Sequence, residues 1–138
     1  MEFVDLSGTM STCIKSSDDS HANVLSAFVT FSLALKAAQT QEVGIITPYH
    51  AQSRLLHAMV RDVNELEALP HAIKCATVHQ FQGSEEDVIV YDAVDCYRLP
   101  FPGALIASTA GRYADRLFNV AMTRSKGKFI CVAKWIVS

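Results

Sequence analysis

The chain has 138 residues, half of them hydrophobic and 19% of them charged. This length predicts a single domain over residues 1–138 with one hydrophobic core. No apolar run approaches the roughly 20 residues that span a bilayer, and the first residues lack the features of a signal peptide, so we expect no membrane partner. The composition predicts a soluble protein of the cytoplasm, or of the nucleus in a eukaryote.

The formal net charge of −2 hides an asymmetry along the chain. Residues 1–95 carry 13 acidic and 5 basic side chains, which gives −8, whereas residues 96–138 carry 1 and 7, which gives +6. Such an asymmetry indicates a basic face close to phosphates or nucleic acid. The alternative interpretation is a basic surface that is simply solvated.

The four cysteines form no metal-binding pattern, because they lie far apart and include no CxxC pair. Cys75 and Cys131 lie within predicted strands, where we expect small core side chains and no disulfides. The sequence therefore predicts no metal site and favours a reducing compartment.

Hydrophobic periodicity predicts strands that alternate with helices. The predicted order is a strand at Glu2–Ser7, a loop at Gly8–Ser20, a helix from about Ser20 to Ala38 capped by Asp19 or Ser20, a strand at Val43–Thr47, a helix at Tyr49–Val63, a loop at Leu66–His71, strands at Ile73–Val78 and Val88–Ala93, a loop at Tyr97–Gly111, a helix at Tyr113–Ser125 and a strand at Lys128–Lys134. Because the strands are continuously apolar, both faces of their sheet should be covered. The predicted fold class is three-layer α/β, with a mainly parallel sheet and helices on both faces.

Three polar segments carry the candidate functional residues. We expect them at the carboxyl ends of strands, where open parallel sheets bind ligands, or on the helix that faces this crevice. The first segment is Thr47–Arg54, directly after a predicted strand. Gln52 lies on the first turn of the following helix and could pair with a base or with a phosphate oxygen. The alternative is an ordinary polar start of a helix.

The second segment, Thr77–Asp87, lies between two apolar strands. Gly83 lets the backbone approach a ligand, and Glu85 could hold a ribose hydroxyl. Thr77 and His79 leave the first strand and could contact a nucleic-acid backbone. The alternatives are a plain strand threonine, a loop histidine with its own partner, and a solvated acidic turn.

The third segment, Arg116–Lys126, is predicted to be helical with a core stripe and a polar stripe. The polar stripe holds Arg116, Asn119 and Thr123. Arg124 lies at the predicted end of the helix, where the macrodipole favours a cation. Its functional interpretation is an arginine finger, which is worth about 10³-fold or more in rate when it meets the charge on a γ-phosphate.

Together these segments resemble motifs IV, V and VI of superfamily 1 helicases, in the branch that includes the nonsense-mediated decay helicase. The matching residues are Ile45–Tyr49 with Gln52, Thr77–His79 with Phe81–Glu85, and Arg116–Arg124. Their order and spacing match, and the resemblance covers about Val43 to Val137. It implies the second, C-terminal RecA-like domain, a fold of the P-loop NTPase type without its own phosphate loop, which closes over ATP held by the first domain.

The resemblance also implies roles for individual residues. Arg124 would be the catalytic arginine finger, Gln52, Gln82, Gly83, Glu85 and Arg116 would bind the nucleotide, and Thr47, Tyr49, Thr77 and His79 would lie toward single-stranded DNA or RNA. The family often places a phosphate-facing arginine directly after the motif IV glutamine. Ser53 stands at that position here, and Arg54 follows it.

The sequence lacks the other half of an ATPase site. It contains no GxxxxGK[ST] loop and no Asp-Glu pair that ends a strand to hold Mg²⁺, since Asp92 and Asp95 are separated by two residues and follow motif V. We expect ATP and Mg²⁺ only together with the N-terminal RecA-like domain, and no ATPase activity from this chain alone. The implied function is the C-terminal motor domain of an ATP-dependent helicase, which also forms part of the single-strand track.

Two other classes of function are open at the level of sequence. A non-catalytic module derived from such a domain would bind nucleic acid or protein through the basic C-terminal face, with a strong salt dependence for nucleic acid. A small-molecule α/β enzyme is disfavoured, because no glycine-rich loop follows the first strand and no nucleophile elbow is present.

Overall fold

The computed structural model describes residues 2–5, 14–15, 21–66, 69–81, 85–98 and 119–136. The elements in chain order are β1 (Glu2–Asp5), β2 (Ile14–Lys15), β3 (His21–Ala22), α1 (Val24–Ala37), β4 (Val43–Thr47), α2 (His50–Glu65), β5 (Lys74–Thr77), β6 (Glu86–Arg98) and β7 (Ser125–Ile136). Residues 119–122 are also helical. No described helix is both long enough and apolar enough to cross a membrane.

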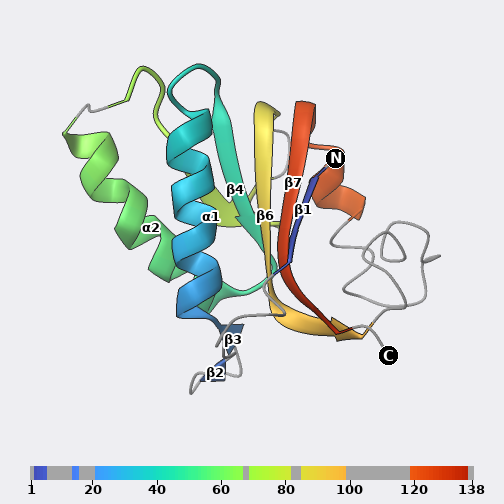
Figure 1. The fold of residues 1–138 in the computed structure, drawn as a ribbon. Helices are drawn as coiled ribbons and strands as arrows, with labels where there is room; N and C mark the ends of the chain where they lie inside the picture. The colour runs from blue at the N-terminus through green and yellow to red at the C-terminus, as the bar shows by residue number, and fades with distance from the viewer. Residues whose placement is uncertain are drawn as a thin grey trace.

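Five strands form one parallel sheet in the order β1-β7-β6-β4-β5, and β2 and β3 form a separate antiparallel pair. The connections from β1 to β4 and from β4 to β5 step in one direction across the sheet, whereas the next two step back. Crossovers of one hand therefore put the first two connections on one face and the last two on the other. Figure 1 shows this arrangement, with α1 and α2 together on one face and the helical residues 119–122 across the sheet.

The core has two halves, one on each face of the sheet, because successive strand residues point to opposite faces. Ile45, Val88 and Val90 pack with α1 and α2 on the first face. Ile46, Ile89, Tyr91, Phe129 and Cys131 pack on the second face against Val78, Phe81 and Ala121. This double burial confirms the predicted three-layer α/β class with helices on both faces.

Gly44 in β4 lets the segment after β5 lie close to the sheet. A Cβ atom at this position would come within 2.6 Å of Cζ of Phe81 and 3.0 Å of Cδ1 of Ile89. The Phe81 ring, which is buried, therefore occupies the space that any larger residue at position 44 would need. This close approach fixes the position of the chain just after β5, at Phe81.

Several predicted boundaries were wrong for identifiable reasons. The cap of α1 is Asn23, whose side-chain oxygen accepts a hydrogen bond from the Ser26 amide, so the helix starts later than predicted. The predicted loop contains the short strand β2, which pairs with β3. Residues 6–13 and 16–20, including the predicted caps, lie outside the described residues.

The two longest strands extend beyond their predicted limits. Tyr97 and Arg98, predicted to begin a loop, continue β6 because they pair with Trp135 and Ile136 of β7. Ser125, predicted to end a helix, pairs with Glu86 and begins β7. Residues 99–118, with the rest of the predicted loop and most of the predicted helix, lie outside the described part of the chain.

Candidate functional site

The sequence suggested that the functional residues gather near the carboxyl ends of the strands, but the structure divides them between the two ends. Thr47 and Thr77 do end β4 and β5, where they are register partners. Glu85 and Arg124, by contrast, directly precede β6 and β7, and the Glu86 amide donates to the Arg124 carbonyl at 3.0 Å. The reason is topological, because a chain that leaves β5 at its carboxyl end must enter the parallel strand β6 at its amino end.

The carboxyl-end group contains the four residues predicted to face nucleic acid. The side chains of Thr47 and Thr77 are buried, and the Thr47 hydroxyl has no hydrogen-bond partner among the described residues. Tyr49 occupies the N-cap position of α2 without making a side-chain capping bond. His79 is exposed on the turn that follows β5.

A tight turn holds the end of β5 in place. The Gln80 side-chain oxygen accepts a hydrogen bond from the Thr77 amide at 3.0 Å, and the Phe81 amide donates to the Thr77 carbonyl at 3.0 Å. The Gln80 amide also donates to the Thr77 hydroxyl, at 3.4 Å. These bonds leave His79 projecting from a turn whose backbone is fixed.

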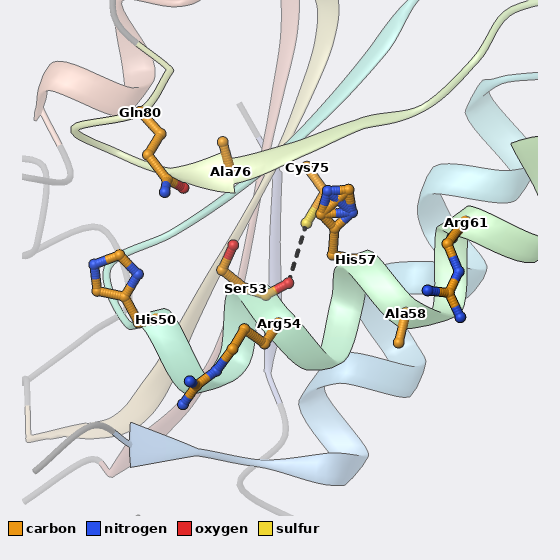
Figure 2. A pocket seen from close by; sticks show the side chains of 9 residues that line it. All are labelled: His50, Ser53, Arg54, His57, Ala58, Arg61, Cys75, Ala76 and Gln80. Atoms are coloured by element: carbon orange, nitrogen blue, oxygen red, sulfur yellow. Dashed lines mark hydrogen bonds between the residues drawn. The ribbon is translucent and has the colours of Figure 1, made fainter. Parts of the chain in front are cut away.

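A cleft of about 620 Å³ opens beside this turn, between α2 and β5. Figure 2 shows side chains from successive turns of α2 along one wall, with Gln80, Ala76 and Cys75 on the opposite wall. The Cys75 thiol donates to the Ser53 carbonyl at 3.8 Å and so ties the strand to the helix.

Gln52 is fully buried, and its amide group is occupied by partners within the chain. The two hydrogens of its Nε2 are shared among three acceptors, Oδ2 of Asp92 at 2.6 Å, the Asn23 carbonyl at 3.0 Å and Oγ of Ser26 at 3.1 Å. Its Oε1 accepts from the Asn23 amide at 2.9 Å. Gln52 therefore joins α2, the cap of α1 and β6, and a contact with nucleotide stays a prediction.

Asp92 is the buried partner of Gln52, a role that the sequence alone does not reveal. It is completely buried in β6, and it also accepts from the Ser26 hydroxyl at 2.9 Å and from the Val94 amide at 3.1 Å. Val94 has a φ of 67°, a conformation that β-branched residues rarely adopt, and its carbonyl accepts from the Asn23 side chain at 3.4 Å. The signal in the sequence was a single acid within an otherwise apolar strand.

Burial raises the pKa of Asp92 to about 6, against the opposing effect of hydrogen bonds from Gln52, Ser26 and Val94. Because the folded pKa lies above the unfolded one, the neutral form favours folding. The contribution of Asp92 to stability is therefore greatest below the ordinary pKa of 3.8 and is lost as the pH rises toward 6.

This linkage predicts a pH dependence that Asp92→Asn should remove. Between pH 4 and 6 the free energy of unfolding of the parent should fall by about 2 kcal/mol relative to the variant, since one pKa unit corresponds to about 1.4 kcal/mol and most of the shift falls in this range. Urea unfolding of both proteins across this range measures the difference. Parallel curves would show that Asp92 does not titrate in this range.

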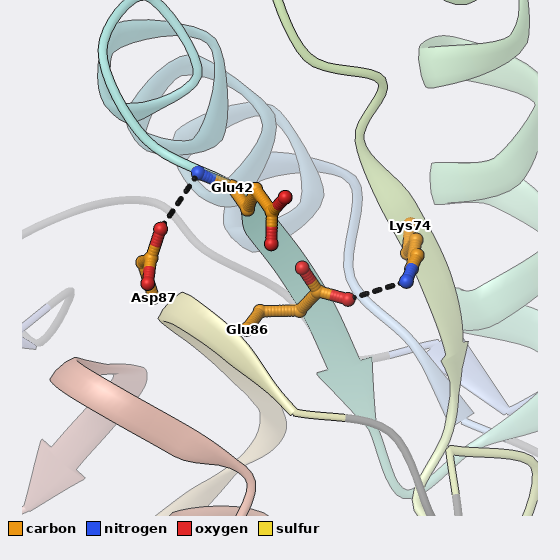
Figure 3. A network of polar contacts seen from close by, with 4 residues as sticks. All are labelled: Glu42, Lys74, Glu86 and Asp87. Atoms are coloured by element: carbon orange, nitrogen blue, oxygen red, sulfur yellow. Dashed lines mark hydrogen bonds and ion pairs between the residues drawn. The ribbon is translucent and has the colours of Figure 1, made fainter.

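Glu85 and Arg124, at the amino ends of β6 and β7, lie beside a cluster of charged residues (Figure 3). Nζ of Lys74 lies 2.7 Å from Oε1 of the buried Glu86, and this pairing raises the pKa of Lys74. The Asp87 carboxylate accepts from the Glu42 amide at 3.4 Å, and the Val88 amide donates to the Glu42 carbonyl at 3.0 Å. These contacts fix the start of β6 and hence the backbone beside Arg124.

Arg124 was predicted to lie at the end of a helix, but the structure places it in a turn. Its amide donates to the Ala121 carbonyl at 3.0 Å, directly before β7 begins. Its side-chain Nε is buried without a hydrogen-bond partner among the described residues. Glu85, one residue before β6, is exposed.

The remaining predicted nucleotide contacts, Gln82, Gly83 and Arg116, lie outside the described residues. Within the described part of the chain, no group of three or more histidine, cysteine or acidic side chains is placed to hold a metal ion. Cys75 and Cys131 lie in strands as predicted, Cys131 buried and Cys75 partly so.

The covered parallel sheet and the three ordered motifs define an α/β domain of the RecA-like class. A family model described as an AAA domain matches residues 2–135, and the chain belongs to that family. This membership, with the relatives below, confirms the resemblance to superfamily 1 helicases of the nonsense-mediated decay branch.

Three curated relatives illustrate the similarity. A Takifugu rubripes protein assigned as regulator of nonsense transcripts 1 is 31% identical over 75% of this chain and 9% of its own length. The DNA polymerase alpha-associated DNA helicase A of Saccharomyces cerevisiae is 33% identical over 65% of this chain and 12% of its own length. A Danio rerio protein assigned as helicase mov-10-B.1 is 28% identical over 70% of this chain and 10% of its own length. The chain thus spans about a tenth of each relative.

Family membership implies that a full-length protein of this kind uses ATP and Mg²⁺. The described residues fit one part of that requirement. The Nε of Arg124, which has no hydrogen-bond partner within the described part of the chain, is a buried cationic donor suited to an anionic ligand.

Proposed function

We propose that this chain is the C-terminal motor domain of an ATP-dependent DNA or RNA helicase. In this role it supplies Arg124 to ATP that is bound on a second domain carrying the phosphate loop. The observation that carries the proposal is the buried Nε of Arg124, which has no hydrogen-bond partner among the described residues. Burial of a guanidinium donor is costly unless a partner completes its hydrogen bonds. An incoming phosphate oxygen would be such a partner.

The neighbours of Arg124 support a nucleotide site at this end of the sheet. Glu85 is exposed and lies beside Glu86, whose amide binds the Arg124 carbonyl at 3.0 Å. A carboxylate there can accept hydrogen bonds from ribose hydroxyls, while Gln82, Gly83 and Arg116 complete the proposed nucleotide contacts.

The carboxyl ends of β4 and β5 are the proposed contact for a single strand of nucleic acid. Thr47 and Thr77 lie side by side there, and Tyr49 and His79 follow them on the helix start and on the turn. The ring of Tyr49 can stack on a base, and the exposed imidazole of His79 can bind backbone oxygens. The Thr47 hydroxyl, which has no hydrogen-bond partner among the described residues, is a further polar group at this end of the sheet. In this proposal nucleotide and nucleic acid occupy opposite ends of one sheet.

The test joins this chain to an N-terminal helicase domain that carries a phosphate loop. We expect neither part alone to hydrolyse ATP and the joined protein to do so, as measured by phosphate release. If the joined protein binds both ATP and oligonucleotide but releases no phosphate, the chain is a binding module and not a motor domain.

A further inference from the structure

The cleft beside α2 has a wall of basic side chains. His50, Arg54, His57 and Arg61 line it from the helix, at steps of four, three and four residues. This spacing places all four on one face of α2, over about three helical turns or roughly 16 Å. Among the residues that the structure describes, no acidic side chain lines the cleft.

The opposite wall is small and mostly uncharged. It is formed by Cys75 and Ala76 of β5 and by the Gln80 side chain (Figure 2). β5 is the last strand of the sheet, and within the described residues no strand pairs with its outer edge. A charged wall facing a narrow neutral one forms an open trough with the sign of charge that attracts phosphates.

The chemistry of the cleft is that of binding and not of covalent catalysis. Burial raises the pKa of the Cys75 thiol to about 12, so the sulfur stays protonated and is a poor nucleophile. Arginine side chains, in contrast, bind phosphate groups with their planar array of N–H donors.

One end of the cleft adjoins the proposed nucleic-acid contacts. His50 follows Tyr49 in the chain, and Gln80 follows His79. The other end, at Arg61, lies nearly three turns further along α2. A strand that passes Tyr49 and His79 would meet the mouth of this cleft next.

From this continuity we propose that the cleft is a second binding site for the phosphodiester backbone of single-stranded nucleic acid. It extends the track along α2 through Arg54 and Arg61. The assignment of the ligand rests on the proposed function, whereas the cleft and its charge are independent of it.

The test is the salt dependence of oligonucleotide binding, measured by fluorescence anisotropy with a labelled single strand of about 12 nucleotides. Each arginine–phosphate contact contributes about 0.7 to the slope of log affinity against log salt for a single strand. Arg54→Gln/Arg61→Gln should therefore lower the slope by about 1.4 and weaken binding to all sequences alike.

The matched control removes the same charge elsewhere. Lys36→Gln/Lys128→Gln alters two exposed lysines beside a different cleft, and it should keep the parental slope. A slope that falls equally in both double variants, or in neither, would overturn the proposal, provided that circular dichroism shows all the proteins folded.

The assay needs no ATP hydrolysis, so its failure differs from failure of the motor function. If the joined protein hydrolyses ATP but replacement of the two arginines leaves the salt dependence of oligonucleotide binding unchanged, only the cleft assignment is wrong. If their replacement weakens ATP binding and not oligonucleotide binding, the cleft takes nucleotide and the proposal falls. A lower slope in a protein without ATPase activity supports the cleft and contradicts the motor function.

Discussion

Arg124→Ala should lower ATP hydrolysis by about 10³-fold or more in the protein joined to a phosphate-loop domain, because an arginine finger acts on charge that develops in the transition state. The backbone of Arg124 should stay in place, since it is held by backbone hydrogen bonds to Ala121 and Glu86 that do not involve the Arg124 side chain. Nucleotide affinity should therefore change little. Single-turnover hydrolysis and equilibrium nucleotide binding, measured on the same preparations, separate the two effects.

Arg124→Lys is the control for this prediction. It keeps the positive charge but loses the planar donors of the guanidinium, so we expect only partial recovery of the rate. Hydrolysis by the Arg124→Ala protein at the parental rate would contradict the assignment of the finger.

Gln52→Leu should destabilise the domain by about 3 to 5 kcal/mol, because it breaks a buried network around a carboxylate. The change removes the donor at 2.6 Å from Asp92 and leaves the Asn23 amide without its acceptor. Both groups are buried, so water cannot replace the lost bonds. Urea unfolding of parent and variant measures the loss.

A double-mutant cycle provides the control. Asp92→Leu removes the carboxylate, so the cost of Gln52→Leu should be much smaller in that background than in the parent. Equal costs in the two backgrounds would show that Gln52 is important for its packing and not for its bond to Asp92.

The central elements of the fold could be predicted because local patterns of apolar residues are enough to indicate them. Val43–Thr47 was predicted with its observed limits, since a short apolar run is typical of a strand covered on both faces, and all five residues are buried. The outer parts of β6 and β7 could not be predicted. Polar residues such as Arg98 of β6 and Lys134 of β7 are part of a strand only because β6 and β7 pair with each other there. Propensity does not encode such long-range pairing.

The candidate site was predicted in its parts but not in its arrangement. Glu85 and Arg124 were proposed as nucleotide contacts from the sequence, and the structure brings their neighbourhoods together through the bond from the Glu86 amide to the Arg124 carbonyl. The sequence did not show that Glu85 and Arg124 lie at the opposite end of the sheet from Thr77, because this placement depends on the order of the strands. Likewise, Gln52 looked like a ligand contact, since nothing local reveals that its partner is Asp92, 40 residues away.

The most direct test of the central claim is nucleotide binding by this chain with and without a phosphate-loop domain. If the pocket lies across a domain interface, a fluorescent ATP analogue should bind the joined protein and leave the isolated chain unoccupied at the same concentrations. Glu85→Ala should then weaken binding by the joined protein. Binding to the isolated chain with the affinity of the joined protein would contradict the account, since the nucleotide would then need no second domain.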